Sequence, residues 1–459
     1  MTGAGPPADP PALLAWAERA AAAGRGIEVL PQLAGLLEQP GLSLTQRQQA
    51  AQLLTHLNRH AEAERLSARC AREAPDDPQV LYNWAATLTA IGRLEDAERI
   101  YDRVIALAPQ DGDAWYNRAT LRRQTPERNH IAALQTQLAV TAPGDTRRVA
   151  LEYALARELE DLGDYPRAFA ALKRGADARR ERLSYRVATD GAAMDAIGRT
   201  FDAAWLASRR PGHADARPVF IVGLPRSGTT LVDRILSSHS AVASRGESAD
   251  LGAAVTRCAA GAHGKADLIR QAAHIEPARL GAEYCRTLPD TGARRVIDKT
   301  PLNFLYLGLL RAALPSATLI HVRRAPLDVC YAMYKTLFRM AYPFSYSLED
   351  LAQYYIAYDI LMEHWRSTLK GALLEVDYEE LIASQESVSR RLIAHCGLEW
   401  EPRVLEFERN SAPTLTASAA QVRQPIYSSS VGLWRRYTAE LLPLRKRLAA
   451  AGIETGECA

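Results

Sequence analysis

The sequence of 459 residues has few cysteines, no long hydrophobic run and no block of one charge. Its six cysteines are scattered without a CxxC pair, which indicates free thiols in a reducing compartment. No uninterrupted apolar segment has the length of a membrane span. Glu18 and Arg19 interrupt the apolar part of the amino-terminal stretch, which is unlike a signal peptide. We therefore expect a soluble, cytoplasmic protein.

Charge is nearly balanced, with 56 Lys and Arg against 53 Asp and Glu. This balance argues against a nonspecific nucleic-acid or membrane surface. Six histidines of the second half show no ligand spacing, so we expect no metal site; they are His239, His263, His274, His321, His364 and His395. The length exceeds that of one typical core and predicts two domains.

The first half of the chain is alanine-rich and repeats. Ala-Pro pairs end at Pro75, Pro109 and Pro143, so that they recur every 34 residues, the period of tetratricopeptide helix pairs. In the unit that ends at Pro109, the small residues Ala85 and Ala97 would let two helices approach each other closely. This half resembles tetratricopeptide repeat proteins, with about four units, some of them degenerate. An ordinary helical bundle is the alternative.

The helical period stops at a Pro- and Gly-containing stretch, and we expect a linker over residues 206–216. It separates a helical domain over 10–205 from a second domain over 217–450, with a flexible tail over 451–459. Apolar strands alternate with helices in the second domain, which predicts a parallel sheet with helices on both faces. The expected strands are 218–222, 294–297, 317–322 and 372–376; the expected helices start near 229 and cover 302–313, 326–339 and 351–369, with a capping box at Ser347 that favours a start near Leu348.

The first of these strands runs into Gly223-Leu-Pro-Arg-Ser-Gly-Thr-Thr230. The stretch matches the nucleotide-binding loop G-x-x-x-x-G-K-[ST], except that Thr229 replaces the lysine. In a strand–loop–helix, backbone N–H groups and the helix dipole favour an anion at the first helical turn. Without the lysine that reaches the β and γ phosphates, the loop is poorly suited to hydrolyse a nucleoside triphosphate. A positive charge stands instead at Arg226, where a planar guanidinium suits a terminal oxyanion group.

Four segments together resemble the sulfotransferases, and in particular the tyrosylprotein sulfotransferases. Pro225-Arg-Ser-Gly-Thr-Thr230 is similar to their loop for the 5′-phosphosulfate of 3′-phosphoadenosine 5′-phosphosulfate (PAPS). Ile297-Asp-Lys-Thr-Pro301 is similar to the segment with a catalytic lysine, and His321–Val329 to the 3′-phosphate segment. The stretch from Gln424 to Trp434 is similar to the closing segment. The resemblance implies a tetratricopeptide solenoid followed by an α/β, P-loop-like, three-layer sulfotransferase domain.

The resemblance also implies roles for individual residues. Arg226 and Lys299 would supply the cations near the bridging oxygen, and Glu247 would accept the proton of the attacking hydroxyl. Donor binding would fall to the loop and to two further residues, with no metal required; these residues are Pro225, Arg226, Ser227, Gly228, Thr229, Thr230, Arg324 and Ser418.

Two positions depart from the family pattern. Ser248 stands where those enzymes have a second acid after the glycine, and Ala332 replaces a serine that usually follows the phosphate-binding arginine by eight residues. One lost hydrogen bond to a phosphate costs about 1.5–3 kcal/mol if nothing replaces it. Ser418, Ser428, Ser429 or Ser430 could compensate.

The leading hypothesis is a PAPS-dependent sulfotransferase that acts on a hydroxyl group of a protein, glycan or small molecule, with protein tyrosine among the candidates. The repeats would bind the acceptor or a partner protein in their groove. One alternative is a protein-interaction scaffold whose nucleotide domain has lost catalysis, for which Ser248 and Ala332 are the best support. Another is a P-loop kinase, against which Thr229 argues.

Overall fold

The computed structural model describes residues 5–22, 25–57, 59–259, 261–410, 412–413 and 421–456. The chain divides into two compact units, the first containing the residues up to Leu162 and the second running from Gly163 to Asn410 and from Val422 onward. The predicted linker at 206–216 and the other predicted domain limits stay predictions. Ser418 lies outside the described residues.

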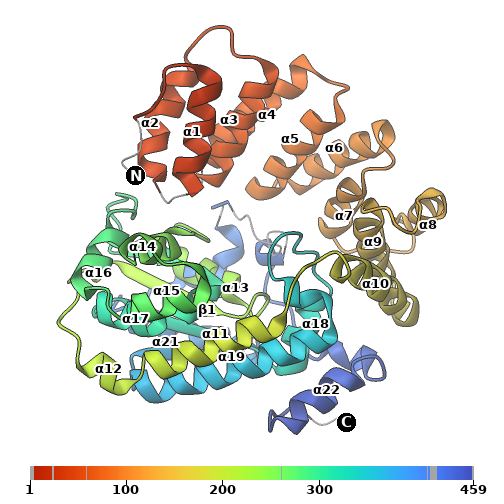
Figure 1. The fold of residues 1–459 in the computed structure, drawn as a ribbon. Helices are drawn as coiled ribbons and strands as arrows, with labels where there is room; N and C mark the ends of the chain where they lie inside the picture. Colours follow the sequence, from red (N-terminus) through yellow and green to blue (C-terminus); the bar gives the residue numbers. More distant parts are fainter. Residues whose placement is uncertain are drawn as a thin grey trace. The chain divides into compact units, whose positions relative to one another are not determined.

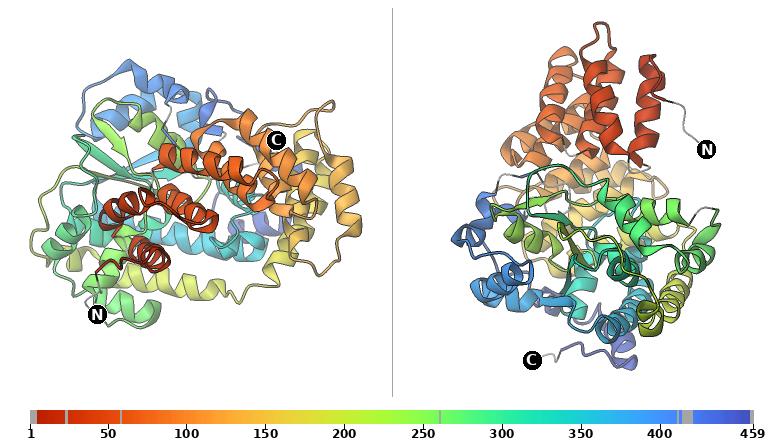
Figure 2. Two further views of the ribbon diagram at one scale, coloured as in Figure 1. Left: turned by 90° about the horizontal axis from the view of Figure 1, so that it is seen from above. Right: turned by 90° about the vertical axis from the view of Figure 1, so that its left-hand side faces the viewer.

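The first unit is built from helices in its described part, which Figures 1 and 2 show in red to gold. They are α1 (Pro10–Ala22), α2 (Gly26–Leu37), α3 (Leu44–His56), α4 (His60–Glu73), α5 (Pro78–Ile91), α6 (Leu94–Leu107), α7 (Gly112–Thr120), α8 (Ile131–Val140) and α9 (Arg147–Asp161). The predicted pairing is clearest in α5 and α6, where Ala85 and Ala97 have no exposed surface. Gly92 ends α5 with a φ of 84°, a conformation that glycine adopts without strain.

The second unit contains a parallel sheet of five strands in the order β2-β3-β1-β4-β5. The strands are β1 (Pro218–Gly223), β2 (Val242–Ser244), β3 (Arg295–Asp298), β4 (Thr318–Arg323) and β5 (Leu373–Asp377). Four of them lie within one residue of the predicted strands. The short strand β2 was not predicted.

Helices surround this sheet. They are α10 (Tyr165–Arg180), α11 (Val187–Thr200), α12 (Ala203–Ala207), α13 (Thr229–Ser237), α14 (Asp250–Cys258), α15 (Gly264–Ala272), α16 (Pro277–Cys285), α17 (Leu307–Ala313), α18 (Pro326–Tyr334), α19 (Leu348–Leu369), α20 (Tyr378–Ala383), α21 (Gln385–His395) and α22 (Leu442–Ala450). Short 3₁₀ helices are η1 (Pro301–Tyr306), η2 (Pro343–Tyr346), η3 (Pro402–Arg409), η4 (Gln421–Arg423) and η5 (Leu433–Tyr437).

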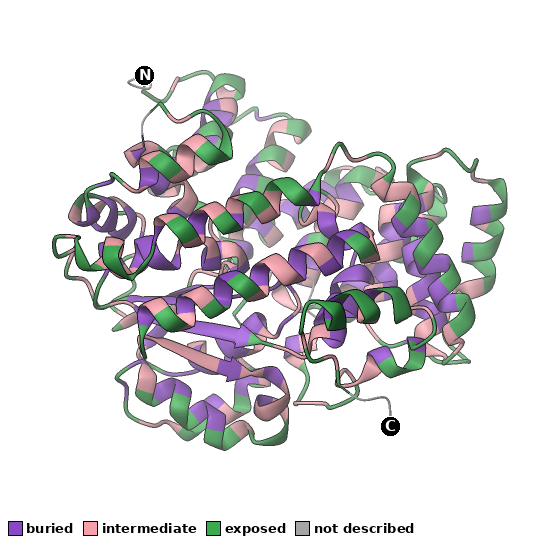
Figure 3. Cartoon of the chain, turned by 60° about the horizontal axis from the view of Figure 1, so that its bottom comes forward, coloured by how far each residue is buried: buried purple, intermediate pink, exposed green. Residues whose placement is uncertain are grey.

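The two faces of β1 pack on different helices, because successive side chains of a strand point to opposite faces. Val219 and Ile221 join a fully buried cluster with residues of α13 and α21, while Phe220 contacts Tyr284 of α16, with ring centroids 5.2 Å apart. Figure 3 colours the central strands as buried. The predicted three-layer α/β architecture is therefore confirmed.

Two predicted helices differ in detail, whereas the start expected near Leu348 is observed. The helix expected at 302–313 is the 3₁₀ helix η1 followed by α17. The helix expected to reach 339 ends at Tyr334, and Arg339 at the predicted end has a positive φ that an α-helix does not contain. The start of α19 at Leu348 follows its cap, where the Ser347 side chain accepts a hydrogen bond from the Asp350 amide. Oδ2 of Asp350 accepts a hydrogen bond from Nε of Arg180 at 2.6 Å.

In the part of the chain that the structure describes, no helix combines the length and the apolar character needed to cross a bilayer. The predicted cytoplasmic location stays a prediction.

Candidate active site

The carboxyl ends of the parallel strands gather the candidate residues at one edge of the sheet. The glycine loop follows β1, Glu247 follows β2, Lys299 follows β3 and Arg324 follows β4. In the order β2-β3-β1-β4-β5, β3 and β2 lie on one side of β1, and β4 and β5 lie on the other. The strand order therefore reverses between β1 and β4, and ligands of open α/β sheets bind at such a switch point. The topology thus brings the glycine loop and the candidate residues Glu247, Lys299 and Arg324 to one edge of the sheet.

The loop after β1 holds a buried polar atom that its surroundings do not satisfy. Ser227 is 1 % exposed, and its Oγ has no hydrogen-bond partner within the described residues. A buried hydroxyl is normally paired. Thr229 and Thr230, the first residues of α13, are buried beside it at the positive end of the helix dipole. This arrangement fits a bound oxyanion group, which would accept from Ser227.

Two glycines set the shape of the loop. A Cβ at Gly223 would lie 2.4 Å from the carbonyl oxygen of Val322 in β4, so the loop can leave β1 only with glycine there. Gly228 has a φ of 107° and caps α13, and a Cβ there would lie 2.5 Å from the ring of Tyr378. Arg226, between them, also has a positive φ of 68°, and non-glycine residues with such a backbone cluster at functional sites.

Lys299 and Glu247 form an ion pair. Nζ of Lys299 donates to Oε1 of Glu247 over 2.6 Å, with 1 % of the lysine side chain exposed and 43 % of the glutamate. The backbone fixes the pair, since the Lys299 amide donates to the Gly246 carbonyl at 2.9 Å. The neighbouring Ser248 amide donates to Oγ1 of Thr300, also at 2.9 Å. Lys299 is thus a buried amine that faces the predicted base.

Asp233 is a neighbour of this pair that the sequence analysis missed. It lies on α13, is 8 % exposed, and its Oδ1 has no hydrogen-bond partner within the described part of the chain. Burial raises the pKa of Asp233, while the positive charge of Lys299 acts in the opposite direction. The signal available in the sequence was a single acid among the apolar residues of the loop's helix.

Arg324 is connected to the glycine loop. Its Nη1 donates to the carbonyl oxygen of Arg226 at 3.2 Å, and its Nη2 donates to that of Ser430 at 2.5 Å. The guanidinium lies over the ring of Tyr378, 4.6 Å from the centroid, and the Tyr378 hydroxyl is 2.9 Å from Oγ of Ser430. Tyr378 had no predicted role, and no local pattern marks it, because it meets Arg324 only through the β4–β5 pairing.

The closing segment is attached to the same region. The Gly432 amide donates to Oδ2 of Asp328 in α18 at 2.7 Å. This hydrogen bond attaches the closing segment to the helix that follows β4. Arg323, by contrast, is half exposed and pairs with Asp377 at 2.9 Å. Of the two adjacent arginines, Arg324 is therefore the one that joins the loop.

A cluster of aromatic side chains lies near Glu247. Burial raises the pKa of Tyr342, and the negative charge of Glu247 adds to this effect. The ring of Tyr342 contacts Phe338 at 4.8 Å and Phe344 at 6.1 Å between centroids, and Phe344 stacks on Tyr354 at 3.6 Å. Tyr342 has a φ of 50°, so strained backbone borders the site on this side as well.

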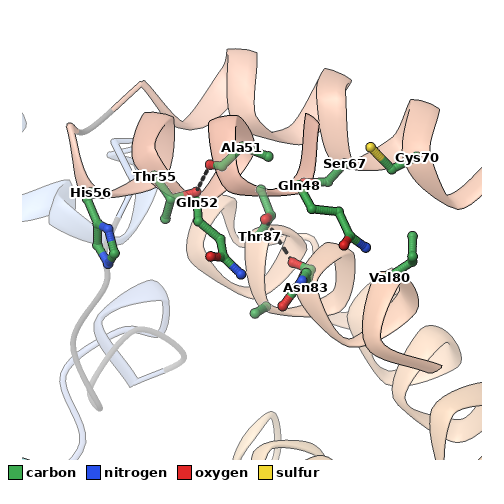
Figure 4. A pocket seen from close by; sticks show the side chains of 11 residues that line it. Gln48, Ala51, Gln52, Thr55, His56, Ser67, Cys70, Val80, Asn83 and Thr87 are labelled. Carbon is green, nitrogen blue, oxygen red and sulfur yellow. Dashed lines mark hydrogen bonds between the residues drawn. The ribbon is translucent and has the colours of Figure 1, made fainter. Parts of the chain in front are cut away.

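The first unit has a hollow of its own, of about 220 Å³, between the helices of two repeats. The side chains of Gln48 and Asn83 project into the space between α3 and α5 (Figure 4). Nε2 of Gln48 is buried there and has no hydrogen-bond partner among the described residues. A buried amide donor without a partner is suited to meet the carbonyl of a bound chain.

Comparison with known families agrees with this division of the chain. Residues 218–402 match a model described as "Sulfotransferase family", and residues 48–121 match one described as "Tetratricopeptide repeat". The chain therefore carries tetratricopeptide repeats followed by a sulfotransferase-family domain, as the resemblance implied.

Individual relatives are more distant. An uncharacterized protein of Aquifex aeolicus (strain VF5) is 33 % identical over 327 residues, which are 68 % of this chain and 43 % of that protein. The chain thus spans less than half the length of this relative. Among solved structures, the sulfotransferase domain of the Synechococcus PCC 7002 olefin synthase is 18 % identical, covers 50 % of this chain and 98 % of its own, and has a TM-score of 0.32. A sulfotransferase of Alicyclobacillus acidocaldarius is also 18 % identical, covers 53 % and 97 %, and has a TM-score of 0.30.

Proposed function

We propose that the protein transfers the sulfuryl group of PAPS to a hydroxyl acceptor. The observation that carries the proposal is the loop after β1, in which the buried Ser227 hydroxyl has no hydrogen-bond partner among the described residues. Two cations belong to the same edge of the sheet. Arg324 is hydrogen-bonded to this loop, and Lys299 lies at the adjacent strand end. When bound, PAPS supplies an activated sulfuryl group on a bisphosphate leaving group.

The proposed roles follow from the contacts. Ser227, Thr229 and Thr230 bind the 5′ end of the donor with the backbone of the loop, together with Pro225 and Gly228. Arg226 and Lys299 stabilise the negative charge that grows on the leaving group. Arg324 binds the 3′-phosphate, and Ser430 replaces the hydrogen bond lost at Ala332, since Ser430 already lies against Arg324 and Tyr378.

Glu247 is the proposed general base. In the structure its carboxylate is held by Lys299, so an acceptor hydroxyl that enters beside the pair meets a carboxylate oxygen and an ammonium together. The carboxylate takes the hydroxyl proton as the oxygen attacks, and the ammonium stays near the bond that breaks. The aromatic cluster around Tyr342 favours an aromatic hydroxyl such as protein tyrosine as the acceptor.

We propose further that the repeats bind the polypeptide acceptor, through the hollow lined by Gln48 and Asn83. If so, Gln48→Leu should raise KM for a protein acceptor and leave KM for a small phenol unchanged. An unchanged KM for the protein acceptor, or an equal rise in KM for both acceptors, would contradict this role.

The test of the activity uses sulfur-labelled PAPS with tyrosine peptides and small phenols. We expect transfer by the unaltered protein, a loss of at least a hundredfold in Lys299→Ala, and no change in the matched variant Lys265→Ala, whose amine is on the surface and pairs with Asp190. The alternative of a scaffold without catalysis predicts no labelled product and an unaltered cellular function in Lys299→Ala.

A further inference from the structure

Three side chains outside the active site form a group suited to hold a metal ion. They are His213 and Asp215, in the segment before β1, and Cys285, at the end of α16. Their ligand atoms all lie within 4.8 Å of one another. Within the residues that the structure describes, no other group of three or more His, Cys, Asp or Glu side chains is this close.

The backbone holds these side chains in place. The His213 amide donates to the carbonyl of Ala313 at the end of α17, over 2.8 Å. A Cβ at Gly212 would lie 2.2 Å from the carbonyl oxygen of Ala312, and one at Gly281 of α16 would lie 2.6 Å from Cβ of His213. The segment is thus packed directly on the backbones of α16 and α17. The three side chains meet because the chain approaches these helices as closely as glycine permits.

We propose that His213, Asp215 and Cys285 bind a divalent transition metal ion, of which Zn²⁺ is the best fit. Imidazole and thiolate ligands favour such ions over Mg²⁺ and Ca²⁺, which prefer oxygen. Metal–ligand distances of about 2.0–2.3 Å place tetrahedral ligand atoms roughly 3.3–3.8 Å apart. The widest pair of ligand atoms therefore needs to contract by about 1–1.5 Å. His213 and Asp215 are partly exposed, which leaves room for water as a fourth ligand.

Arg217 fixes the carboxylate of Asp215. The backbone amide of Arg217 donates to Oδ1 of Asp215 at 2.9 Å, its Nη2 donates to Oδ2 at 2.7 Å, and its Nε is 3.1 Å from both oxygens. The guanidinium of Arg217 lowers the pKa of Asp215, so the carboxylate is ionised. The Nε hydrogen is shared between both oxygens, so a metal ion on one of them would replace this shared contact, while the backbone amide and Nη2 keep the carboxylate oriented.

Cys285 is the ligand that must lose a proton. Burial, together with the charge and hydrogen bond of Asp215, raises the pKa of its thiol to about 12, whereas the charge of Arg217 lowers it. The other charged group close to Arg217 is Asp290. The metal forms its bond to sulfur as the S–H bond breaks, and one proton goes to buffer. The bound ion would tie the segment before β1 to α16.

The experiment is a calorimetric titration of the metal-stripped full chain with ZnCl₂ in two buffers of different ionisation enthalpy. We expect one ion per chain, about one proton released, and at least tenfold weaker binding in His213→Ala and in Cys285→Ser. The matched variants His274→Ala and Cys258→Ser should bind as the unaltered chain does. Co²⁺ in place of Zn²⁺ should show a thiolate-to-metal absorption that Cys285→Ser abolishes.

Two results would overturn the proposal. One is no uptake of Zn²⁺ by a chain that is folded by circular dichroism. The other is binding that persists at full strength when His213→Ala and Cys285→Ser are combined. Thermal unfolding in the presence of a chelator shows whether each variant is folded before the titration, so a misfolded variant is not mistaken for a lost site.

Discussion

Gly228→Ala should damage the nucleotide site through a defined collision. The φ of 107° at Gly228 is one that an alanine adopts at a cost of about 1–3 kcal/mol. The new methyl group would also lie 2.5 Å from Cδ2 of Tyr378, and overpacking of this kind costs about 1–3 kcal/mol. We therefore expect a loss of about 2–6 kcal/mol in the free energy of unfolding, by adding these two costs.

The same collision should weaken binding of the nucleotide. A displaced Tyr378 ring no longer supports the guanidinium of Arg324, so we expect at least tenfold weaker binding of 3′-phosphoadenosine 5′-phosphate in calorimetry. Gly371→Ala is the matched control, since its φ is +81° but nothing lies within 4 Å of its Cβ. It should show the backbone cost alone and normal binding. The reasoning is refuted if both variants lose equal stability, or if Tyr378→Ala fails to relieve part of the loss in a double mutant.

Three other predictions concern single side chains. Ser227→Ala removes a buried hydroxyl that has no partner among the described residues, so the midpoint of thermal unfolding should stay within a few degrees of that of the unaltered protein. Nucleotide binding should weaken about tenfold. A large loss of stability would show that the hydroxyl is hydrogen-bonded within the protein. Arg324→Lys keeps the charge but loses the two-pronged contact with the carbonyls of Arg226 and Ser430, and calorimetry should show at least tenfold weaker binding. The third concerns Glu375, where the hydrogen bond from His321 and then Arg366 lower the pKa to about 2, from 4.5. Because the folded pKa is depressed, this stability is present above pH 4.5 and is lost as the pH falls toward 2, and denaturation curves of Glu375→Gln should lack that part of the pH dependence.

The strands could be predicted where the signal was strong. Runs of apolar residues bounded by Gly, Pro or charge marked β1, β3, β4 and β5, because β1, β3 and β4 are buried on both faces and β5 is partly buried. β2 has only the three residues Val242–Ser244, and its pairing with β3, not its own composition, makes it a strand. The helix α18 could not have reached 339, because Arg339 has a positive φ, which no periodicity shows.

The site could be predicted as far as its residues follow strands. Arg226, Lys299 and Arg324 each stand just after a predicted strand, and parallel strands bring such positions to one edge. Glu247 follows the unpredicted strand β2 and was expected only from the family resemblance. Asp233 and Tyr378 could not be predicted in this way, because their neighbours come from distant parts of the chain and the contacts exist only in the folded sheet.

The most direct test of the central claim is a calorimetric titration of the full chain with 3′-phosphoadenosine 5′-phosphate, compared with ATP and Mg²⁺. We expect one site for the bisphosphate, no metal requirement, binding at least tenfold tighter than for ATP, and at least tenfold weaker binding in Arg324→Lys. Absence of binding by the folded protein, or a preference for ATP with Mg²⁺, would contradict it.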